Sequence, residues 1–160
     1  MSGNKYIKII ATVANNGVIA DNREIPWDAN LKITEEFLDY TKNSIVVMGN
    51  HTFQDRGPIL VNRKNWVVTS NVKNKRRTKG IKYFDNPEKV ITTNPRTNKW
   101  VIGGADMFRY FMFVANEMIL FYLKKDYEGD LHFPVIYEDV WDIKILEDNP
   151  DFKKVLYKRK

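Results

Sequence analysis

The feature that most constrains the fold is a series of short apolar runs that are rich in β-branched residues. Runs of this kind are typical of strands that are buried on both faces of a sheet. Polar or helical segments separate each run from the next, which predicts a mostly parallel sheet with crossover helices on both faces. The predicted strands are Tyr6–Ala14, Ser44–Gly49, Asn65–Ser70, Ile81–Phe84, Lys99–Ile102 and the first part of segment 117–130, "EMILFYLKKDYEGD", which then becomes a charged loop.

Apolar residues in segment 30–42 recur at helical spacing, with Asp28 or Asn30 as the N-cap. Further helices are expected to begin near His51, Pro87 and Ala105. The last two segments, "DVWDIKILE" and "FKKVLYKRK", alternate apolar and polar residues and predict a closing antiparallel pair of strands. We therefore expect one α/β domain over residues 1–160.

Composition excludes several classes of protein. The 160 residues are 43% hydrophobic, which fits a globular core, and no run approaches the ~18 apolar residues of a membrane span. The N-terminus shows no signal-peptide pattern, so we expect a cytoplasmic protein without a membrane partner. With no Cys and only His51 and His132 as imidazole ligands, no metal site is expected.

The net charge of +6 has a local origin. Segment 73–82, "KNKRRTKGIK", carries six Lys or Arg and no acid, and six subtracted from +6 leaves the remaining residues neutral on balance. A basic face spread over a whole domain is typical of duplex binding, whereas one basic loop is not. The segment is either a solvated loop or a site for a phosphate-bearing small molecule, and nucleic acid is not the expected partner.

Three predicted strands end in residues that suit a bound anion. "VIGGADMF" places Gly-Gly between a strand and a helix, where the backbone can approach a phosphate closely and the helix offers free N–H groups. "MGNHTF" is a second strand-to-helix junction, and "VVTS" ends a third strand with two hydroxyls before the basic loop. Because ligands of such sheets bind at the carboxyl ends of the strands, the pattern predicts a dinucleotide with an extra phosphate.

In order and spacing, five landmarks resemble the dihydrofolate reductase family over nearly the whole chain: "IIATVANNGVIADNREIPW", "VVMGNHTF", "NRKNWVVTS", "WVIGGADMF" and "EGDLHFP". The resemblance implies a three-layer α/β fold. Its mostly parallel, twisted, eight-stranded sheet would be flanked by about four helices, with antiparallel C-terminal strands. It also implies a monomer that reduces 7,8-dihydrofolate to tetrahydrofolate with NADPH.

The resemblance assigns cofactor contacts by position. Gly103-Gly104 corresponds to a cis peptide beside the pyrophosphate, while Thr69 and Ser70 correspond to contacts for the adenosine end and its 2′-phosphate. Two positions depart from the family pattern: Asn50 stands where Arg or Lys is common, and Asp106 where some relatives have Arg. The implied cofactor-binding residues are Thr12, Ile19, Asn50, His51, Thr52, Thr69, Ser70, Lys73, Arg76, Gly103, Gly104, Ala105, Asp106, Met107 and Phe108.

On the substrate side, Arg63 matches the residue that pairs with the glutamate α-carboxylate of folate, a task suited to the bidentate guanidinium. Segment 17–25 resembles the loop that closes over the nicotinamide, and Trp27 would hold an ordered water near the pterin. The implied substrate-binding residues are Ile10, Ile33, Phe37, Leu60, Arg63, Ile102 and Phe121.

The family's proton donor is missing from its expected place. Counting back four residues from Phe37, the buried Asp or Glu of the family falls at Ile33, and its hydroxyl partner falls at Phe121. An apolar pair leaves no polar partner buried and unsatisfied, but one positioned acid supplies roughly 10²–10⁴-fold in rate. Glu36, one turn on, and Asp28, beside Trp27, are the candidate substitute acids.

Three explanations of the missing acid stay open. Glu36 or Asp28 reaches the pocket; the protein reduces another pterin or a pyrimidine; or it is a low-activity relative retained for NADPH binding or assembly. The landmarks "HFP" and "NRK" favour folate over other heterocycles, while the lost acid pair favours the non-catalytic alternative.

Overall fold

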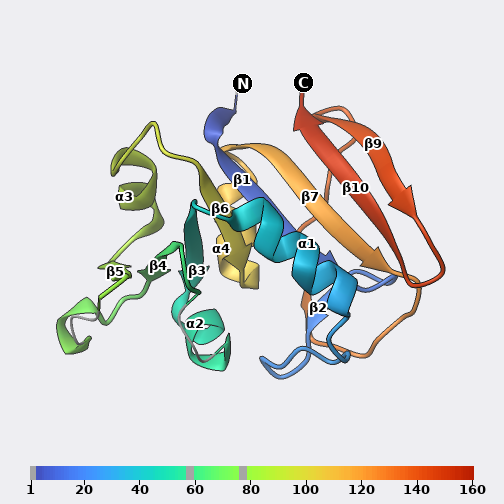
Figure 1. Ribbon diagram of the computed structural model, residues 1–160, viewed down its shortest axis with the longest axis horizontal. Helices are drawn as coiled ribbons and strands as arrows, with labels where there is room; N and C mark the ends of the chain where they lie inside the picture. The colour runs from blue at the N-terminus through green and yellow to red at the C-terminus, as the bar shows by residue number, and fades with distance from the viewer. Residues whose placement is uncertain (1–2, 57–59, 76–78) are drawn as a thin grey trace.

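The computed structural model describes residues 3–56, 60–75 and 79–160. Its main sheet has eight strands in the order β5-β4-β3-β6-β1-β7-β10-β9 (Figure 1). The first six strands of this order pair in parallel, whereas β7–β10 and β10–β9 are antiparallel. The strands are β1 (Asn4–Val13), β3 (Ile45–Gly49), β4 (Lys64–Val68), β5 (Ile81–Phe84), β6 (Lys99–Gly103), β7 (Ala115–Leu123), β9 (Trp141–Asp148) and β10 (Phe152–Arg159). The predicted fold class is confirmed.

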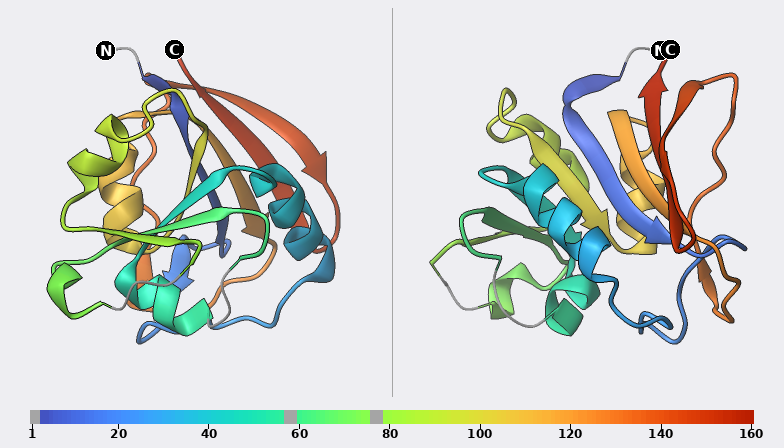
Figure 2. Two further views of the ribbon diagram at one scale, coloured as in Figure 1. Left: turned by 60° about the vertical axis from the view of Figure 1, so that its left-hand side comes forward. Right: turned by 45° about the vertical axis from the view of Figure 1, so that its right-hand side comes forward.

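In the part of the chain that the structure describes, four helices cover the two faces of this sheet (Figures 1 and 2). They are α1 (Leu31–Thr41), α2 (Asn50–Arg56), α3 (Pro87–Thr92) and α4 (Ala105–Phe111). A short 3₁₀ helix, η1 (Val72–Asn74), follows β4, and a separate two-stranded sheet joins β2 (Val18–Ala20) to β8 (Leu131–His132).

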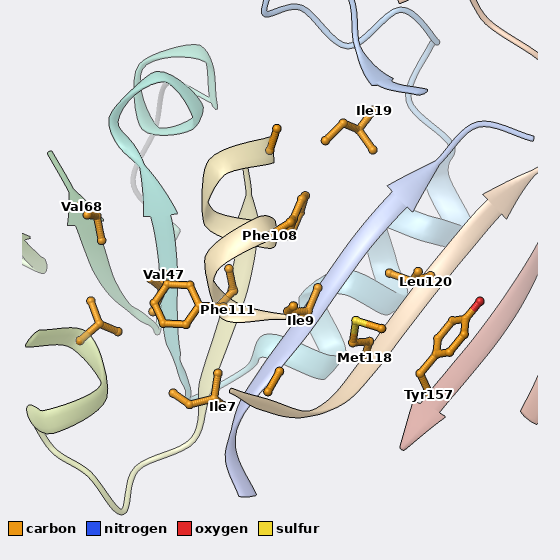
Figure 3. Close-up of a cluster of buried hydrophobic side chains, with 14 of the residues drawn as sticks. Ile7, Ile9, Ile19, Val47, Val68, Phe108, Phe111, Met118, Leu120 and Tyr157 are labelled. Carbon is orange, nitrogen blue, oxygen red and sulfur yellow. The ribbon is translucent and has the colours of Figure 1, made fainter. Parts of the chain in front are cut away.

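The hydrophobic core lies in two clusters, one on each face. On the α4 face, Phe108 and Phe111 of α4 pack toward Ile7 and Ile9 of β1 (Figure 3). On the α1 face, Ile33 of α1 packs with β-strand residues in the second cluster. Because both faces carry apolar side chains, the central strands read as continuous apolar runs in the sequence.

Local signals explain the helix boundaries. The side chain of Asn30 accepts a hydrogen bond from the backbone N–H of Ile33 at 3.0 Å, so Asn30, and not Asp28, is the N-cap of α1. Asn86 caps α3 in the same way and is followed by Pro87 at the first helical position. Helix α1 ends before Asn43, which has a positive φ of 56°.

The register of the strands brings the predicted anion-binding ends together. Gly49 of β3 lies opposite Val68 of β4, and Met48 lies opposite Gly103 of β6. The loops after β3, β4 and β6 therefore meet at one edge of the sheet, as expected for parallel strands. In the described part of the chain, no helix is long and apolar enough to span a membrane.

Candidate active site

The junction between β6 and α4 is built for close backbone approach. The Gly103-Gly104 peptide bond is cis, and Gly103 has a φ of 132°, a region that side chains rarely adopt. A Cβ on Gly104 would lie 3.3 Å from the hydroxyl oxygen of Thr52, so the Thr52 side chain stands directly against this turn. The sequence prediction of a Gly-Gly turn between strand and helix is met at this position.

The β3–α2 junction packs against the same turn. A Cβ on Gly49 would meet the Met107 side chain at 3.6 Å and the backbone of Gly103 at 3.9 Å. The first turns of α2 and α4 leave backbone N–H groups without intrahelical partners. The side-chain oxygen of Asn50 is buried and finds no hydrogen-bond partner among the described residues. Free N–H groups beside a glycine turn fit a pyrophosphate. The Asn50 oxygen is an acceptor and adds no hydrogen bond to such an anion.

The proposed adenosine end lies beyond β4. Thr69 is buried and its hydroxyl accepts a hydrogen bond from the N–H of Asn71 at 3.2 Å, which shapes the turn into η1. Ser70 and Lys73 are exposed on this turn. Arg76, the other predicted contact, lies outside the described residues. The Ser70 hydroxyl and the Lys73 ammonium are therefore accessible to a ligand at this turn.

The remaining predicted cofactor residues fall into two groups. Ile19, Ala105 and Phe108 are buried and Met107 is half-buried, so these four can offer apolar walls or backbone groups. Thr12 is half-buried and also carries a hydroxyl. His51 is exposed at the start of α2. Asp106 is exposed and pairs with Arg109 at 2.8 Å, one turn along α4. This ion pair offsets the negative charge that Asp106 places near the glycine turn.

The floor of the predicted pterin pocket is apolar. Ile33 on α1 and Phe121 on β7 are 8% and 1% exposed and belong to one hydrophobic cluster with Ile10. Phe37, Leu60 and Ile102 pack against the edge of this cluster and are only partly buried. Phe121 makes an edge-on ring contact with Phe152 at 5.6 Å between centroids. The described side chains therefore place hydrocarbon at the position where the family resemblance expects an acid and its hydroxyl partner.

Arg63 is held in place by three oxygen atoms. Its Nε donates to the Thr41 hydroxyl at 2.9 Å, and its two Nη atoms donate to the backbone carbonyls of Val61 and Leu38. A guanidinium has five N–H donors, so two remain for an incoming carboxylate. The side chain is oriented before any ligand arrives, and it lies beside Leu60 in the chain segment leading into β4.

Sequence reasoning missed two polar residues that position Arg63. Thr41 is fully buried and its hydroxyl also donates to the Phe37 carbonyl at 2.9 Å. Asn65 is 1% exposed, and its amide bonds the backbone of Leu60 at 3.2 and 3.0 Å and the Arg63 carbonyl at 3.1 Å. The available signal was position: Thr41 follows Ile33 and Phe37 at four-residue spacing, and Asn65 begins an apolar strand.

Of the two candidate substitute acids, Glu36 lies beside this apolar floor in an ion pair, and Asp28 lies at the surface. Glu36 sits on the flank of α1 that faces β10, where its carboxylate pairs with the ammonium of Lys154. A hollow of about 330 Å³ lined by Glu36, Asp39, Tyr40 and Lys154 lies at this flank. Asp28 is exposed. These placements count against both residues as proton donors to a ligand lying on Ile33 and Phe121.

The segment expected to close over the cofactor is tied to the β7–β8 connection. Its strand β2 pairs with β8, and the N–H of Asn22 donates to the Asp130 carboxylate at 3.0 Å. Asn22 and Arg23 have positive φ values of 48° and 69°, which close a tight turn. Trp27 is half-buried and its ring packs edge-on against Tyr127 at 5.4 Å. Asp130 was not predicted as a site residue, although it lies within the "EGDLHFP" landmark.

Comparisons with known proteins agree with this geometry. The sequence profile described as dihydrofolate reductase matches residues 6–157. Dihydrofolate reductase of Bacillus subtilis (strain 168) is 28% identical over 163 residues, which cover 96% of this chain and 95% of that protein. A solved structure of dihydrofolate reductase from Enterococcus faecalis, complexed with NADP(H) and RAB-propyl, matches with a TM-score of 0.82 and 21% identity over 99% of both chains.

A different kind of relative is also found. Segregation and condensation protein A of Mycoplasma pneumoniae (strain ATCC 29342 / M129 / Subtype 1) is 35% identical over 120 residues, which are 72% of this chain but only 22% of that protein. A domain of this type therefore also occurs as a minor part of a much longer chain. The profile match over most of the sequence and the three-layer fold establish that the chain belongs to the dihydrofolate reductase family.

Proposed function

We propose that this protein reduces 7,8-dihydrofolate to tetrahydrofolate with NADPH, with low activity at neutral pH. The observation that carries the choice of folate is Arg63. Its guanidinium is fixed by Thr41, Val61 and Leu38 and keeps two donors for a carboxylate. A pterin or pyrimidine without a glutamate tail would bring no carboxylate to these two donors.

The residues at the carboxyl ends of β3, β4 and β6 support NADPH as the cofactor. The Gly103-Gly104 turn and Thr52 would hold the pyrophosphate, and Ser70 and Lys73 would hold the 2′-phosphate. Once bound there, NADPH supplies the hydride of the reaction. Closure of segment 17–25, held by Asp130, would exclude water from the nicotinamide side of the pocket.

Reduction adds a hydride and a proton to the substrate ring, so the ring needs a proton donor. In the pocket proposed here, Ile33 and Phe121 give up no proton, and Glu36 is engaged by Lys154. The proton therefore comes from solvent, through the side of the pocket near half-buried Trp27. A positioned acid contributes roughly 10²–10⁴-fold in rate, and we expect the activity to be reduced by about this factor at neutral pH.

A second candidate function is a binding or assembly role without turnover. The match to segregation and condensation protein A favours this role. In that protein, the matching domain makes up only 22% of a longer chain whose name does not describe a reductase. The apolar pair at Ile33 and Phe121 is compatible with such a role, since a pocket that only binds needs no proton donor.

The experiment that separates the two candidates is NADPH oxidation by the purified protein with dihydrofolate, measured from acidic to neutral pH. Folate-dependent oxidation that grows toward acidic pH supports the reductase. Binding of NADPH with no oxidation at any pH supports the assembly role. Oxidation with a pterin lacking the glutamate tail, at the same rate as with dihydrofolate, would favour a different heterocycle as the substrate. We propose that this reductase acts in the cytoplasm on a small-molecule substrate, without a nucleic-acid partner.

A further inference from the structure

Strand β9 forms an open edge of the main sheet. Among the described strands it pairs only with β10, and it is the last strand in the sheet order (Figure 1). Ile143 and Ile145 of β9 are 47% and 56% exposed, although their positions opposite Tyr157 and Val155 place them on the same face as the buried core cluster. An exposed apolar edge strand is a template for pairing with another strand.

The register of β9 shows which backbone groups are free. The N–H of Lys160 donates to the carbonyl of Val140 at 2.9 Å, so these two residues form a hydrogen-bonded pair. Such pairs alternate along an antiparallel ladder with pairs whose N–H and C=O point away from the partner strand. Trp141, Ile143 and Ile145 therefore direct their N–H and C=O groups to the open edge.

The charges of β9 are complementary to those of a second β9 in one register. Asp142 and Lys144 are exposed and flank Ile143 on the opposite face of the strand. Neither side chain makes a hydrogen bond or ion pair within the described ranges 3–56, 60–75 and 79–160. Lys158, which lies opposite Asp142 on β10, is 3.9 Å from Glu117 instead.

We propose that β9 is a self-association edge, which pairs antiparallel with β9 of a second copy about a two-fold axis at Ile143. In this register Ile143 lies opposite Ile143 of the second copy, and Ile145 lies opposite Trp141. These are the residues whose backbone groups face outward, so each such pair exchanges both of its N–H···O bonds. Asp142 of each copy lies opposite Lys144 of the other, in the closer non-hydrogen-bonded pairs.

The same strand sets a limit to the pairing. A register shift between Lys154 and Val155 marks a bulge at Leu146 of β9, which ends the regular segment after Ile145. A lysine on an edge strand ordinarily prevents such pairing. Here Asp142 neutralises Lys144 only in the register centred on Ile143. The contact is short, well below the roughly 800 Å² per partner of a stable complex, so the dimer should be weak and dependent on concentration.

The test is sedimentation equilibrium of the purified full chain over a wide concentration range, with single charge reversals. Asp142→Lys or Lys144→Asp alone places like charges opposite each other at both ends of the pairing. Each should raise the dissociation constant about tenfold or more. The double variant Asp142→Lys with Lys144→Asp restores both opposite-charge pairs and should return the dissociation constant to that of the original protein.

Mixing the two single variants provides the register-specific control, because only the mixed dimer then has opposite charges at both positions. Lys89→Asp on α3 makes the same charge change as Lys144→Asp but lies away from β9, and it should leave association unchanged. If the protein is a monomer at every concentration, as the family resemblance implies, the proposal is overturned. A dimer that Lys144→Asp weakens no more than Lys89→Asp would overturn it too.

Discussion

The carboxylate of Glu36 on α1 pairs with the ammonium of Lys154 on β10, although the two residues are 118 positions apart in the chain. The two side chains are only 23% and 13% exposed. Lys154 lies directly opposite Phe121 in the antiparallel register. The ion pair thus stands beside the apolar floor, and it gives the Glu36 carboxylate a structural partner.

This pairing predicts that Glu36→Gln lowers the free energy of unfolding but leaves the rate of dihydrofolate turnover nearly unchanged. The substitution leaves the ammonium of Lys154 partly buried without its carboxylate, which costs on the order of 1–3 kcal/mol of unfolding free energy. Turnover of dihydrofolate at neutral pH should change less than about twofold, because Glu36 donates no proton in this account. Urea unfolding and steady-state kinetics measure the two effects. Glu35→Gln, an exposed neighbour on the same helix, is the control for both.

The helices and central strands could be predicted because their signals are local. Apolar runs, the cap at Asn30 and Pro87 at the start of α3 each act within a few residues. The partner of Glu36 could not be predicted, because the flank of α1 that faces β10 depends on the order of strands in the sheet. The two-stranded sheet of β2 and β8 was also missed, since strands of three and two residues carry no usable periodicity.

The candidate site was predicted best where a backbone shape is required. Gly103-Gly104 and Thr52 were placed by the strand-turn-helix pattern and by the family resemblance, and they meet in space. The polar supports of Arg63 were not found from the sequence. In the sequence, nothing distinguishes Thr41 and Asn65 from other polar residues at the edge of the core. Their contacts with Arg63 form only when the loop before β4 folds against them.

Arg63→Ala should weaken folate binding much more than binding of a pterin that lacks the glutamate tail. Loss of a charge-assisted bidentate contact is worth about 1.5–3 kcal/mol, or roughly 10–100-fold in dissociation constant. Equilibrium titration with both ligands measures the difference. Lys64→Ala, an exposed cation at the next position, should affect neither. Equal losses for the two ligands would mean that Arg63 only supports the loop between Leu38 and Val61.

NADPH should raise the melting temperature more than NADH does, because Ser70, Lys73 and the rest of the basic segment suit a 2′-phosphate. Replacing Lys73, Lys75 and Arg76 together by Ala should reduce the NADPH shift and spare the NADH shift. A thermal-shift titration with both dinucleotides measures this. If NADPH and NADH raise the melting temperature of the unmodified protein equally, the basic segment is only a solvated surface loop.

Buried Lys99 predicts a pH dependence of stability. Its ammonium donates to the carbonyls of Asn94 and Thr97 at 2.6 and 3.3 Å, and burial lowers its pKa below the ordinary 10.5. Between the lowered folded pKa and 10.5 the unfolded chain binds more protons than the folded chain, so the free energy of unfolding rises with pH. Below the folded pKa this contribution is flat.

The difference between the original protein and Lys99→Met isolates this contribution. Urea unfolding of both proteins at about pH 8 and pH 10 should show the original protein gaining stability relative to the variant as pH rises. Other titrating groups, including Tyr122 and Tyr157, whose pKa values are raised mainly by burial, occur in both proteins and cancel. A parallel response of the two proteins would show that Lys99 keeps its ordinary pKa.

The apolar floor predicts insensitivity to diaminopyrimidine antifolates. Such inhibitors bind a buried carboxylate through a protonated ring, and a cationic ring set against Ile33 and Phe121 would lose its hydration without a compensating charge. Inhibition at neutral pH should therefore need far higher concentrations than the same assay with the variant Ile33→Asp, Phe121→Thr. Tight inhibition of the unmodified protein would mean that an acid already reaches the pocket.

The most direct test of the account is the pH profile of kcat/KM for dihydrofolate in the unmodified protein and in Ile33→Asp, Phe121→Thr. With the proton supplied by solvent, the unmodified protein should gain about tenfold in kcat/KM for each pH unit toward acid. The double variant should gain roughly 10²–10⁴-fold at neutral pH and reach a plateau below the pKa of its new acid. Ile33→Asp alone should gain less, since its carboxyl would lack a hydroxyl partner. A plateau at neutral pH in the unmodified protein, with no gain in the double variant, would contradict the account.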